Sequence, residues 1–169
     1  MHGCTRCRTL YGNSRRITKV SLTRLHLFLF FKLPSAFWSG VRVKKCTETY
    51  ALVTVKHGWF NSNPFKSMFW AVQGMAAELS TGILIMQEIR RSKHRVSMLV
   101  VQNKANFSKK ATGKIRFQCE AQDSIQKAFT QAIETKQGVT FWLNSQGFDE
   151  SNDCVSSFDF QWSIKVKSF

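Results

Sequence analysis

NPFKSMFWAVQGMAAELSTGILIMQEI, residues 63–89, is the stretch that decides the fold. Its apolar side chains recur every three or four residues, which predicts a long helix with one face in the core. That stripe comprises Phe65, Met68, Phe69, Val72, Met75, Ala76, Leu79 and Ile83. The opposite side carries small residues, namely Ser67, Ala71, Gly74, Ala77, Thr81 and Gly82, with Glu78 among them. Because small residues let a backbone or a ligand approach closely, we expect a crevice there that holds the carboxylate of Glu78.

The ends of this helix also have recognisable signals. Asn63 suits the N-cap and Pro64 suits the first helical turn, so we expect the helix to begin there. Arg90, Arg91, Lys93 and His94 follow near its end, where cations complement the helix dipole. The sequence therefore predicts one helix that runs from Asn63 to Ile89.

The flanking sequence reads as short helices and strands. We expect a short helix from Ser21 to Lys32. It should end there because Pro34 disfavours helical geometry at the residue before it. Before the long helix we expect a turn at 36–40 and strands at 41–44 and 47–56. After it we expect a buried strand at 95–107, a strand at 114–121 and a helix at 123–136. The chain then continues with a strand at 139–143, a polar turn at 144–153 and a strand at 154–167. Apolar and polar side chains alternate in 114–121, so one face of this strand is exposed to solvent, which implies an antiparallel sheet. The class is α+β, with an irregular basic extension at 1–19 and a single domain at 20–169.

Composition and charge limit the function. With 43% hydrophobic residues and 15 Phe among 169 residues, the chain is a folded domain. The net charge of +15 suggests nucleic acid, but six basic residues fall in the first 24 positions, which contain no acid. Nothing in the rest interleaves basic and exposed aromatic residues as a single-strand-binding surface does. We therefore expect no nucleic acid partner, although a basic interaction protein that works through residues 1–24 stays an alternative.

Five cysteines, Cys4, Cys7, Cys46, Cys119 and Cys154, form an odd set without a regular framework. A reduced, cytoplasmic location is the simplest inference. The Cys4–Cys7 pair has only His2 nearby as a further ligand, so we expect no metal site. We also expect no cofactor, and no run approaches the ~20 apolar residues of a membrane span.

The first 36 residues allow several interpretations. Basic residues precede the apolar run at 25–31, and Pro34-Ser35-Ala36 follows it, as in a loose secretory signal. Ser14-Arg15-Arg16 weakly suggests a twin-arginine signal, and the same segment would suit a mitochondrial presequence. We favour an irregular extension that leads into a short amphipathic helix.

The long helix and about six antiparallel strands have the layout of the hotdog fold, and the start of the helix supports that. Asn63-Pro64, followed by Glu78, resembles the hotdog thioesterases of the phenylacetyl-CoA and 4-hydroxybenzoyl-CoA type. Their pattern is Asn-Pro, a short turn, His-Gly-Gly, and an acid seven residues after the last glycine. Residues 33–43 also look like the lead-in of that superfamily. Ala77-Glu78-Leu79 with Gly82 is most similar to its uncharacterised bacterial thioesterase-like branch, and the likeness covers about residues 25–167.

The resemblance implies hydrolysis of an acyl-CoA thioester. Glu78 is the expected base or nucleophile, and Asn63 the expected group that positions water or the carbonyl. The expected substrate-binding residues are Ser67, Met68, Phe69, Trp70, Gln73 and Thr81. Site halves in this superfamily usually come from two subunits, so a homodimer is implied, with a tetramer as the alternative. The chain has Phe69-Trp70-Ala71 in place of His-Gly-Gly, and a non-catalytic acyl- or lipid-binding hotdog protein is therefore the second hypothesis.

Overall fold

The computed structural model describes residues 21–167, and the predicted extension at 1–19 lies outside them. The elements in chain order are α1 (Leu22–Lys32), α2 (Pro34–Trp38), β1 (Arg42–Cys46), β2 (Tyr50–Lys56), the 3₁₀ turn η1 (Trp59–Asn61), α3 (Trp70–Ser92), β3 (Val96–Phe107), β4 (Lys114–Glu120), α4 (Gln122–Thr135), β5 (Val139–Phe148) and β6 (Cys154–Val166). None of the helices within residues 21–167 combines the length and the apolar character that crossing a bilayer requires.

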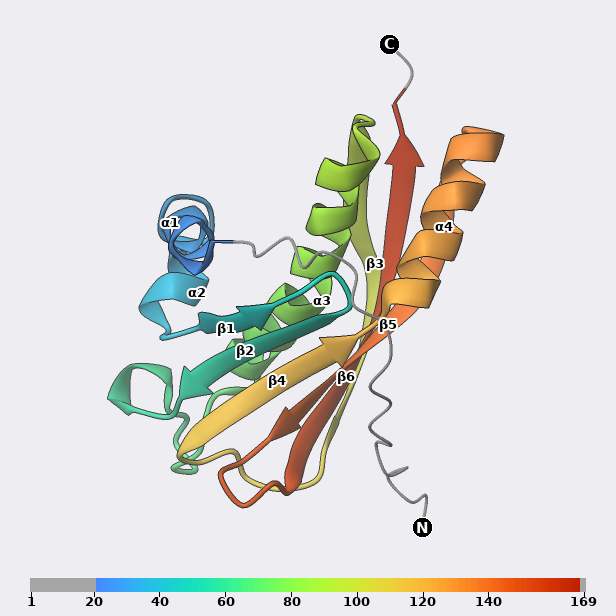
Figure 1. Cartoon of the computed structure of the whole chain (residues 1–169). Coiled ribbons are helices and arrows are strands. Elements are labelled where there is room, and N and C mark those ends of the chain that lie inside the picture. The colour runs from blue at the N-terminus through green and yellow to red at the C-terminus, as the bar shows by residue number, and fades with distance from the viewer. Residues whose placement is uncertain (1–20, 168–169) are drawn as a thin grey trace.

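The strands form one antiparallel sheet in the order β1-β2-β4-β5-β6-β3. The sheet curves around α3, and α4 lies beside β5 and β6 (Figure 1). Inward side chains of the strands, such as Phe117, Phe158 and Ile164, are almost fully buried. This arrangement confirms the expected α+β class and the hotdog layout of a sheet around a long central helix.

Helix α3 is buried on more of its circumference than the stripe alone predicts. Val72, Ala76, Leu79 and Ile83 lie in the core as expected. Part of the small-residue face is also covered, because a side chain at Gly82 would meet the ring of Trp162 at 3.4 Å. The same holds at Gly74, where Phe158 lies 3.7 Å away. Rings of β6 therefore occupy part of the expected crevice, while Glu78 on the same face stays exposed.

The predicted start of α3 is also wrong. The helix begins at Trp70, and residues 63–69 form a separate turn before it. The side-chain Oδ1 of Asn63 accepts hydrogen bonds from the backbone N–H groups of Phe65 (2.9 Å) and Ser67 (3.2 Å). Lys66 has a φ of 57°, which no right-handed helix contains. Asn63 thus caps a tight turn, and two of the expected stripe residues, Phe65 and Phe69, are exposed.

Other boundaries differ for similar tertiary reasons. Residues 34–38 form the helix α2 where a turn was predicted at 36–40. Strand β5 continues to Phe148, because Ser145 and Gly147 point inward and pair with β6, so the turn occupies only the residues after Phe148. The strand at 95–107 was predicted to be buried, but β3 is mostly exposed, because it lies at the edge of the sheet and packs mainly against β6.

Candidate active site at the start of the long helix

A pocket of about 390 Å³ opens beside the first turn of α3. Its walls come from the turn before α3, from α3 itself and from the segment between β3 and β4. The lining residues are Asn63, Ser67, Met68, Trp70, Gln73, Phe107, Ser108, Lys109, Lys110 and Ala111. Five of the eight residues predicted for the site therefore line this pocket. They were expected on one continuous helix, but Asn63, Ser67 and Met68 lie in the turn before α3.

Asn63 and Ser67 form one wall of the pocket through a small hydrogen-bond network. The Nδ2 of Asn63 donates to the Oγ of Ser67 at 3.1 Å, and the Ser67 backbone N–H donates back to Asn63 Oδ1. Ser67 is 7% exposed. An amide nitrogen carries two N–H donors, so Asn63 keeps one for water or for a substrate oxygen.

Met68 and Gln73 form the deeper wall. Met68 is buried, and its backbone N–H donates to the carbonyl of Ala111 at 2.8 Å. Gln73 Nε2 donates to the Met68 carbonyl at 3.2 Å, while Gln73 Oε1 accepts from Ser156 Oγ at 2.9 Å. Gln73 is thus held at both ends of its amide, which makes it a structural support of the wall.

The first turn of α3 supplies unpaired donors. The Phe69 N–H donates to the Asn61 carbonyl at 2.8 Å, which fixes the residue before the helix. The N–H groups of Trp70 and Ala71 have no hydrogen-bond partner within residues 21–167. The start of a helix leaves such groups free and favours a carbonyl oxygen or an anion there. The indole of Trp70 is 57% exposed at the same position.

Glu78 does not line this pocket. It lies eight residues after Trp70, which is about 12 Å along a helix axis. Its side chain is exposed in the single chain and has no hydrogen bond or ion pair with any described residue. Partial burial among neighbouring atoms nevertheless raises the pKa of Glu78 above its usual 4.5. Glu78 therefore stands as an unpartnered carboxylate on the outer side of α3.

Thr81 and Phe69 also lie outside the pocket lining. The Thr81 Oγ1 donates to the carbonyl of Glu78 (2.9 Å) and accepts from Trp162 Nε1 (3.1 Å), so it satisfies a buried indole. Phe69 is 45% exposed and packs edge-on against Trp70, with the ring centroids 6.0 Å apart. Thr81 has a packing role, and Phe69 flanks the pocket.

The segment 107–111 is the part of the site that the sequence did not reveal. Lys109 Nζ lies 2.7 Å from a carboxylate oxygen of both Asp149 and Asp153, which ties this segment to the β5–β6 turn. Hydrogen bonds to these carboxylates raise the pKa of Lys109 to about 12, and the hydrogen bond from Lys109 lowers the pKa of Asp149. Only the fold joins these positions, so no local motif marks them.

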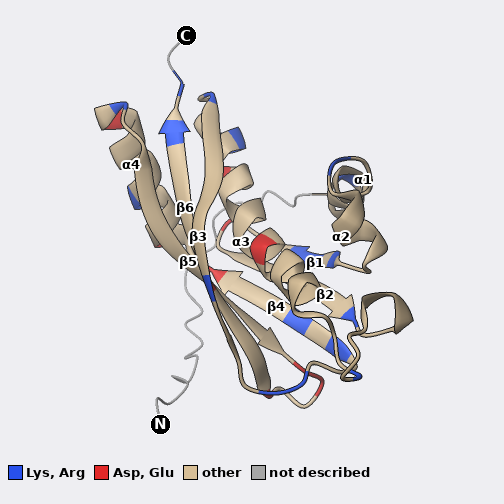
Figure 2. Cartoon of the chain, turned by 180° about the vertical axis from the view of Figure 1, so that it is seen from behind, with Lys and Arg blue, Asp and Glu red and all other residues tan. Residues whose placement is uncertain are grey.

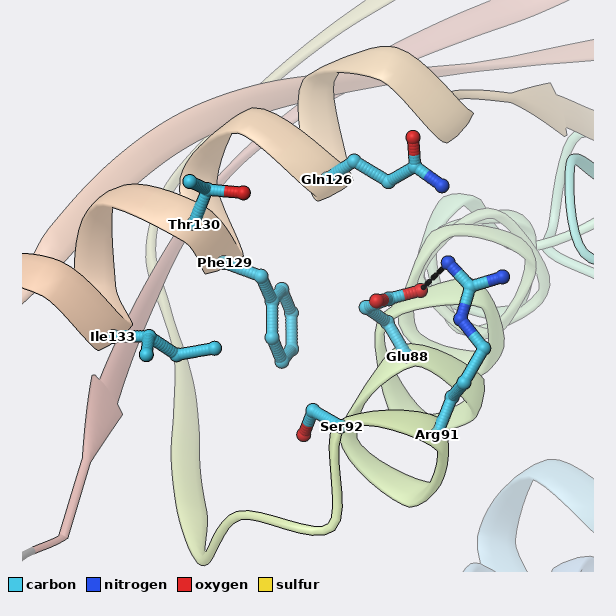
Figure 3. A pocket seen from close by; sticks show the side chains of 7 residues that line it. All are labelled: Glu88, Arg91, Ser92, Gln126, Phe129, Thr130 and Ile133. Carbon is cyan, nitrogen blue, oxygen red and sulfur yellow. Dashed lines mark ion pairs between the residues drawn. The ribbon is translucent and has the colours of Figure 1, made fainter.

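A second groove of about 360 Å³ lies between the end of α3 and α4 (Figure 3). It contains none of the predicted site residues, and the Glu88 carboxylate in it is already paired with Arg91 at 2.6 Å. Among residues 21–167, no three His, Cys, Asp or Glu side chains come together in a way that could hold a metal ion. The pocket at the start of α3 is therefore the better candidate site.

Solved structures share this fold. The probable thioesterase PA5026 of Pseudomonas aeruginosa superposes with a TM-score of 0.74 at 22% identity, over 86% of this chain and 96% of that one. A protein of unknown function from Chlorobaculum tepidum gives 0.74 at 15% identity, over 86% and 94%. Thioesterase HI1161 of Haemophilus influenzae gives 0.67 at 12% identity, over 88% and 93%.

None of the curated proteins compared with this chain matches it. The model of the family described as "Domain of unknown function (DUF4442)" matches residues 24–164, most of the chain. The chain therefore belongs to the DUF4442 family and has the hotdog fold of thioesterase-like proteins.

Proposed function

We propose that the protein hydrolyses an acyl thioester, with acyl-CoA as the expected substrate and Glu78 as the group that activates water. The observation that carries the proposal is the carboxylate of Glu78, which is unpartnered and has a raised pKa on the central helix of a thioesterase-like fold. A general base works best when its pKa lies closer to the working pH than that of an ordinary carboxylate.

The start of α3 suits the other half of the reaction. A thioester carbonyl gains negative charge as water attacks, and fixed N–H donors stabilise that charge. The unpaired N–H groups of Trp70 and Ala71 are the donors in this scheme, and Asn63 supplies a further N–H beside them. The acyl group then lies along Met68 and Phe107 in the pocket.

Two subunits are needed for this scheme. Glu78 and the N–H donors of Trp70 and Ala71 in the same chain are about two helical turns apart, so one chain does not present both groups to a single carbonyl. In the proposed homodimer, Glu78 of one subunit faces the pocket of the other. The exposure of Glu78 in the single chain fits such an arrangement.

Steady-state hydrolysis of an acyl-CoA panel tests the role of Glu78. Glu78→Gln keeps the size of the side chain and removes the base, so we expect kcat to fall by about 10²–10⁴. Glu88→Gln is the control, because it makes the same chemical change on the same helix at a carboxylate that already pairs with Arg91. Equal kcat values for Glu78→Gln and the unmodified protein would exclude a catalytic role for Glu78.

The backbone donor at residue 70 is tested by a pair of variants. Phe69 has extended geometry (φ −58°, ψ 131°), so proline is tolerated at position 70, where it removes the N–H. We expect Trp70→Pro to lower kcat by about 10²–10³ relative to Trp70→Ala, which keeps the N–H. Equal rates for the two variants would exclude this N–H as a donor.

Mixed dimers test the sharing of the site between subunits. Glu78→Gln and Trp70→Pro homodimers are each expected to be inactive. After they are unfolded together and refolded at equal concentration, half of the dimers are mixed and hold one intact site, so roughly a quarter of the full activity should return. No recovery, with mixed dimers demonstrated by mass spectrometry, would place both groups in one subunit's site.

A non-catalytic acyl-binding protein is the second candidate, because Trp70 stands where the similar enzymes have glycine. This function predicts that an acyl-CoA binds and quenches tryptophan fluorescence while no free thiol is released. Release of free thiol by the unmodified protein would show that it is an enzyme and not a non-catalytic acyl-binding protein.

A further inference from the structure

Large apolar side chains cover the outside of α1, α2 and η1. This surface, here called the aromatic flank, consists of Leu27, Phe30, Phe31, Trp38, Trp59 and Phe60. Phe31 is 70% exposed, Trp38 65% and Trp59 93%. In Figure 1 and Figure 2 the elements that carry it lie together on the side of the molecule opposite α4. Concentrated apolar exposure of this kind marks an interaction surface.

Helix α1 is apolar on two faces, and its own domain uses only one. Leu25 and Leu29 are buried against the core, and His26 Nε2 lies 3.1 Å from the carbonyl of Val43 in β1. Leu27 and Phe31 point away from this contact and stay exposed. A helix that is apolar all round is normally covered on all sides, so the outer face of α1 lacks a partner within residues 21–167.

The aromatic flank is held in place by packing and hydrogen bonds. Phe30 contacts Phe31 and Phe37 edge-on, with centroid distances of 4.9 and 5.2 Å. Asn61 is buried and joins η1 to its neighbours, because its Nδ2 donates to the carbonyl of Ser39 (3.0 Å) and to that of Lys56 (2.9 Å). The surface is thus preformed and does not depend on a partner to assemble it.

The positive charge around this flank favours a negatively charged partner. Residues 1–77 contain 12 of the 25 Lys and Arg but one of the 10 Asp and Glu, namely Glu48, which pairs with Arg91. Lys and Arg lie on α1, β1 and the end of β2 beside the flank (Figure 2). A second copy of the same flank would bring positive charge against positive charge. An anionic lipid surface, in contrast, matches both the charge and the exposed Trp and Phe.

We propose that the aromatic flank docks the protein on the surface of anionic phospholipid membranes. Trp38, Trp59 and Phe31 insert at the level of the headgroups, and the surrounding Lys and Arg contact lipid phosphates and carboxylates. No helix within residues 21–167 is long and apolar enough to cross the bilayer. This peripheral contact is independent of the proposed thioester hydrolysis, because the pocket residues are not part of the flank.

Co-sedimentation of the full chain with vesicles tests the proposal. We expect binding to vesicles of three parts phosphatidylcholine to one part phosphatidylserine, and at least about tenfold weaker binding to phosphatidylcholine alone. The double substitution Phe31→Ser and Trp59→Ser should weaken binding to the anionic vesicles by about tenfold or more. The control pair Ile133→Ser and Trp142→Ser removes exposed apolar groups from α4 and β5 and should bind like the unmodified chain.

Three results would overturn the proposal. Undiminished binding by the Phe31→Ser/Trp59→Ser variant would assign lipid contact to the basic residues at 1–20, which that variant keeps. Equal binding to neutral and anionic vesicles would show that the Lys and Arg side chains do not recognise anionic headgroups. A lower molecular mass of this variant in solution, relative to the unmodified chain, would make the flank a contact between copies. Circular dichroism establishes that both variants fold.

Discussion

Ser156 Oγ donates a 2.9 Å hydrogen bond to Gln73 Oε1, and this contact joins strand β6 to helix α3 behind the candidate pocket. Both residues are buried. Ser156→Ala leaves the amide oxygen of Gln73 without this partner, so we expect the free energy of unfolding to fall by about 1–3 kcal/mol. Denaturant unfolding measures this loss. Adding Gln73→Met removes the orphaned amide, so the double variant should lose less than the sum of the two single variants.

Gly147 is required by the close approach of β5 to the core. A Cβ at this position would lie 2.6 Å from Cε1 of Phe117 and 3.0 Å from Cζ. Gly147→Ala should therefore destabilise the protein by about 1–3 kcal/mol through overpacking. At Gly138 nothing lies within 4 Å, and Gly138→Ala should be close to neutral in the same thermal unfolding experiment. Equal melting temperatures for the two variants would contradict this account of Gly147.

The raised pKa of Glu78 predicts a specific pH dependence of stability. The folded chain holds the Glu78 proton more tightly than the unfolded chain, so stability falls as pH rises from about 4.5 through the folded pKa. Glu78→Gln removes this penalty, so its melting temperature should exceed that of the unmodified chain at pH 7. The difference should vanish at pH 3.5, where both chains are neutral at this position. A difference that is constant with pH would exclude the ionisation of Glu78 as its cause.

Two cysteines should be inert to thiol reagents. Burial raises the pKa of Cys46 to about 11, and burial with the nearby Glu120 charge raises the pKa of Cys119 to about 12. The thiolate is the reactive form, so little of either thiol reacts at pH 8. Iodoacetamide labelling followed by peptide mass mapping should leave both unmodified in the folded chain and modify both in guanidinium chloride. Rapid labelling of either one without denaturant would contradict their burial.

Helices α3 and α4 both end in a lysine with left-handed backbone geometry, Lys93 (φ 58°) and Lys136 (φ 54°). Residues with a Cβ are disfavoured there, and glycine is not. Lys93→Gly and Lys136→Gly should each raise the free energy of unfolding by up to about 1 kcal/mol. Lys127→Gly, at an exposed position inside α4, should lower it by a similar amount. A loss of stability in all three variants would show that the lysine charge outweighs the backbone term.

Local sequence patterns predicted the central helix, the sheet and much of the core, because side-chain period reports directly which face is buried. They failed where contacts between distant residues decide the structure. Asn63 carries a sound N-cap signal, yet it caps the turn that ends at Met68, because Met68 pairs with Ser62 and bonds to Ala111. Nothing in the sequence near residue 78 shows that rings of β6 pack beside Gly74 and Gly82 while Glu78 stays exposed.

Asn61 connects η1 to two parts of the fold. Its Nδ2 fixes the end of α2 and the end of β2, while its backbone carbonyl accepts from the N–H of Phe69, next to the first residue of α3. The aromatic flank and the start of α3 are therefore both tied to Asn61. One residue thus holds the ends of α2 and β2 through its side-chain amide and the residue before α3 through its backbone carbonyl.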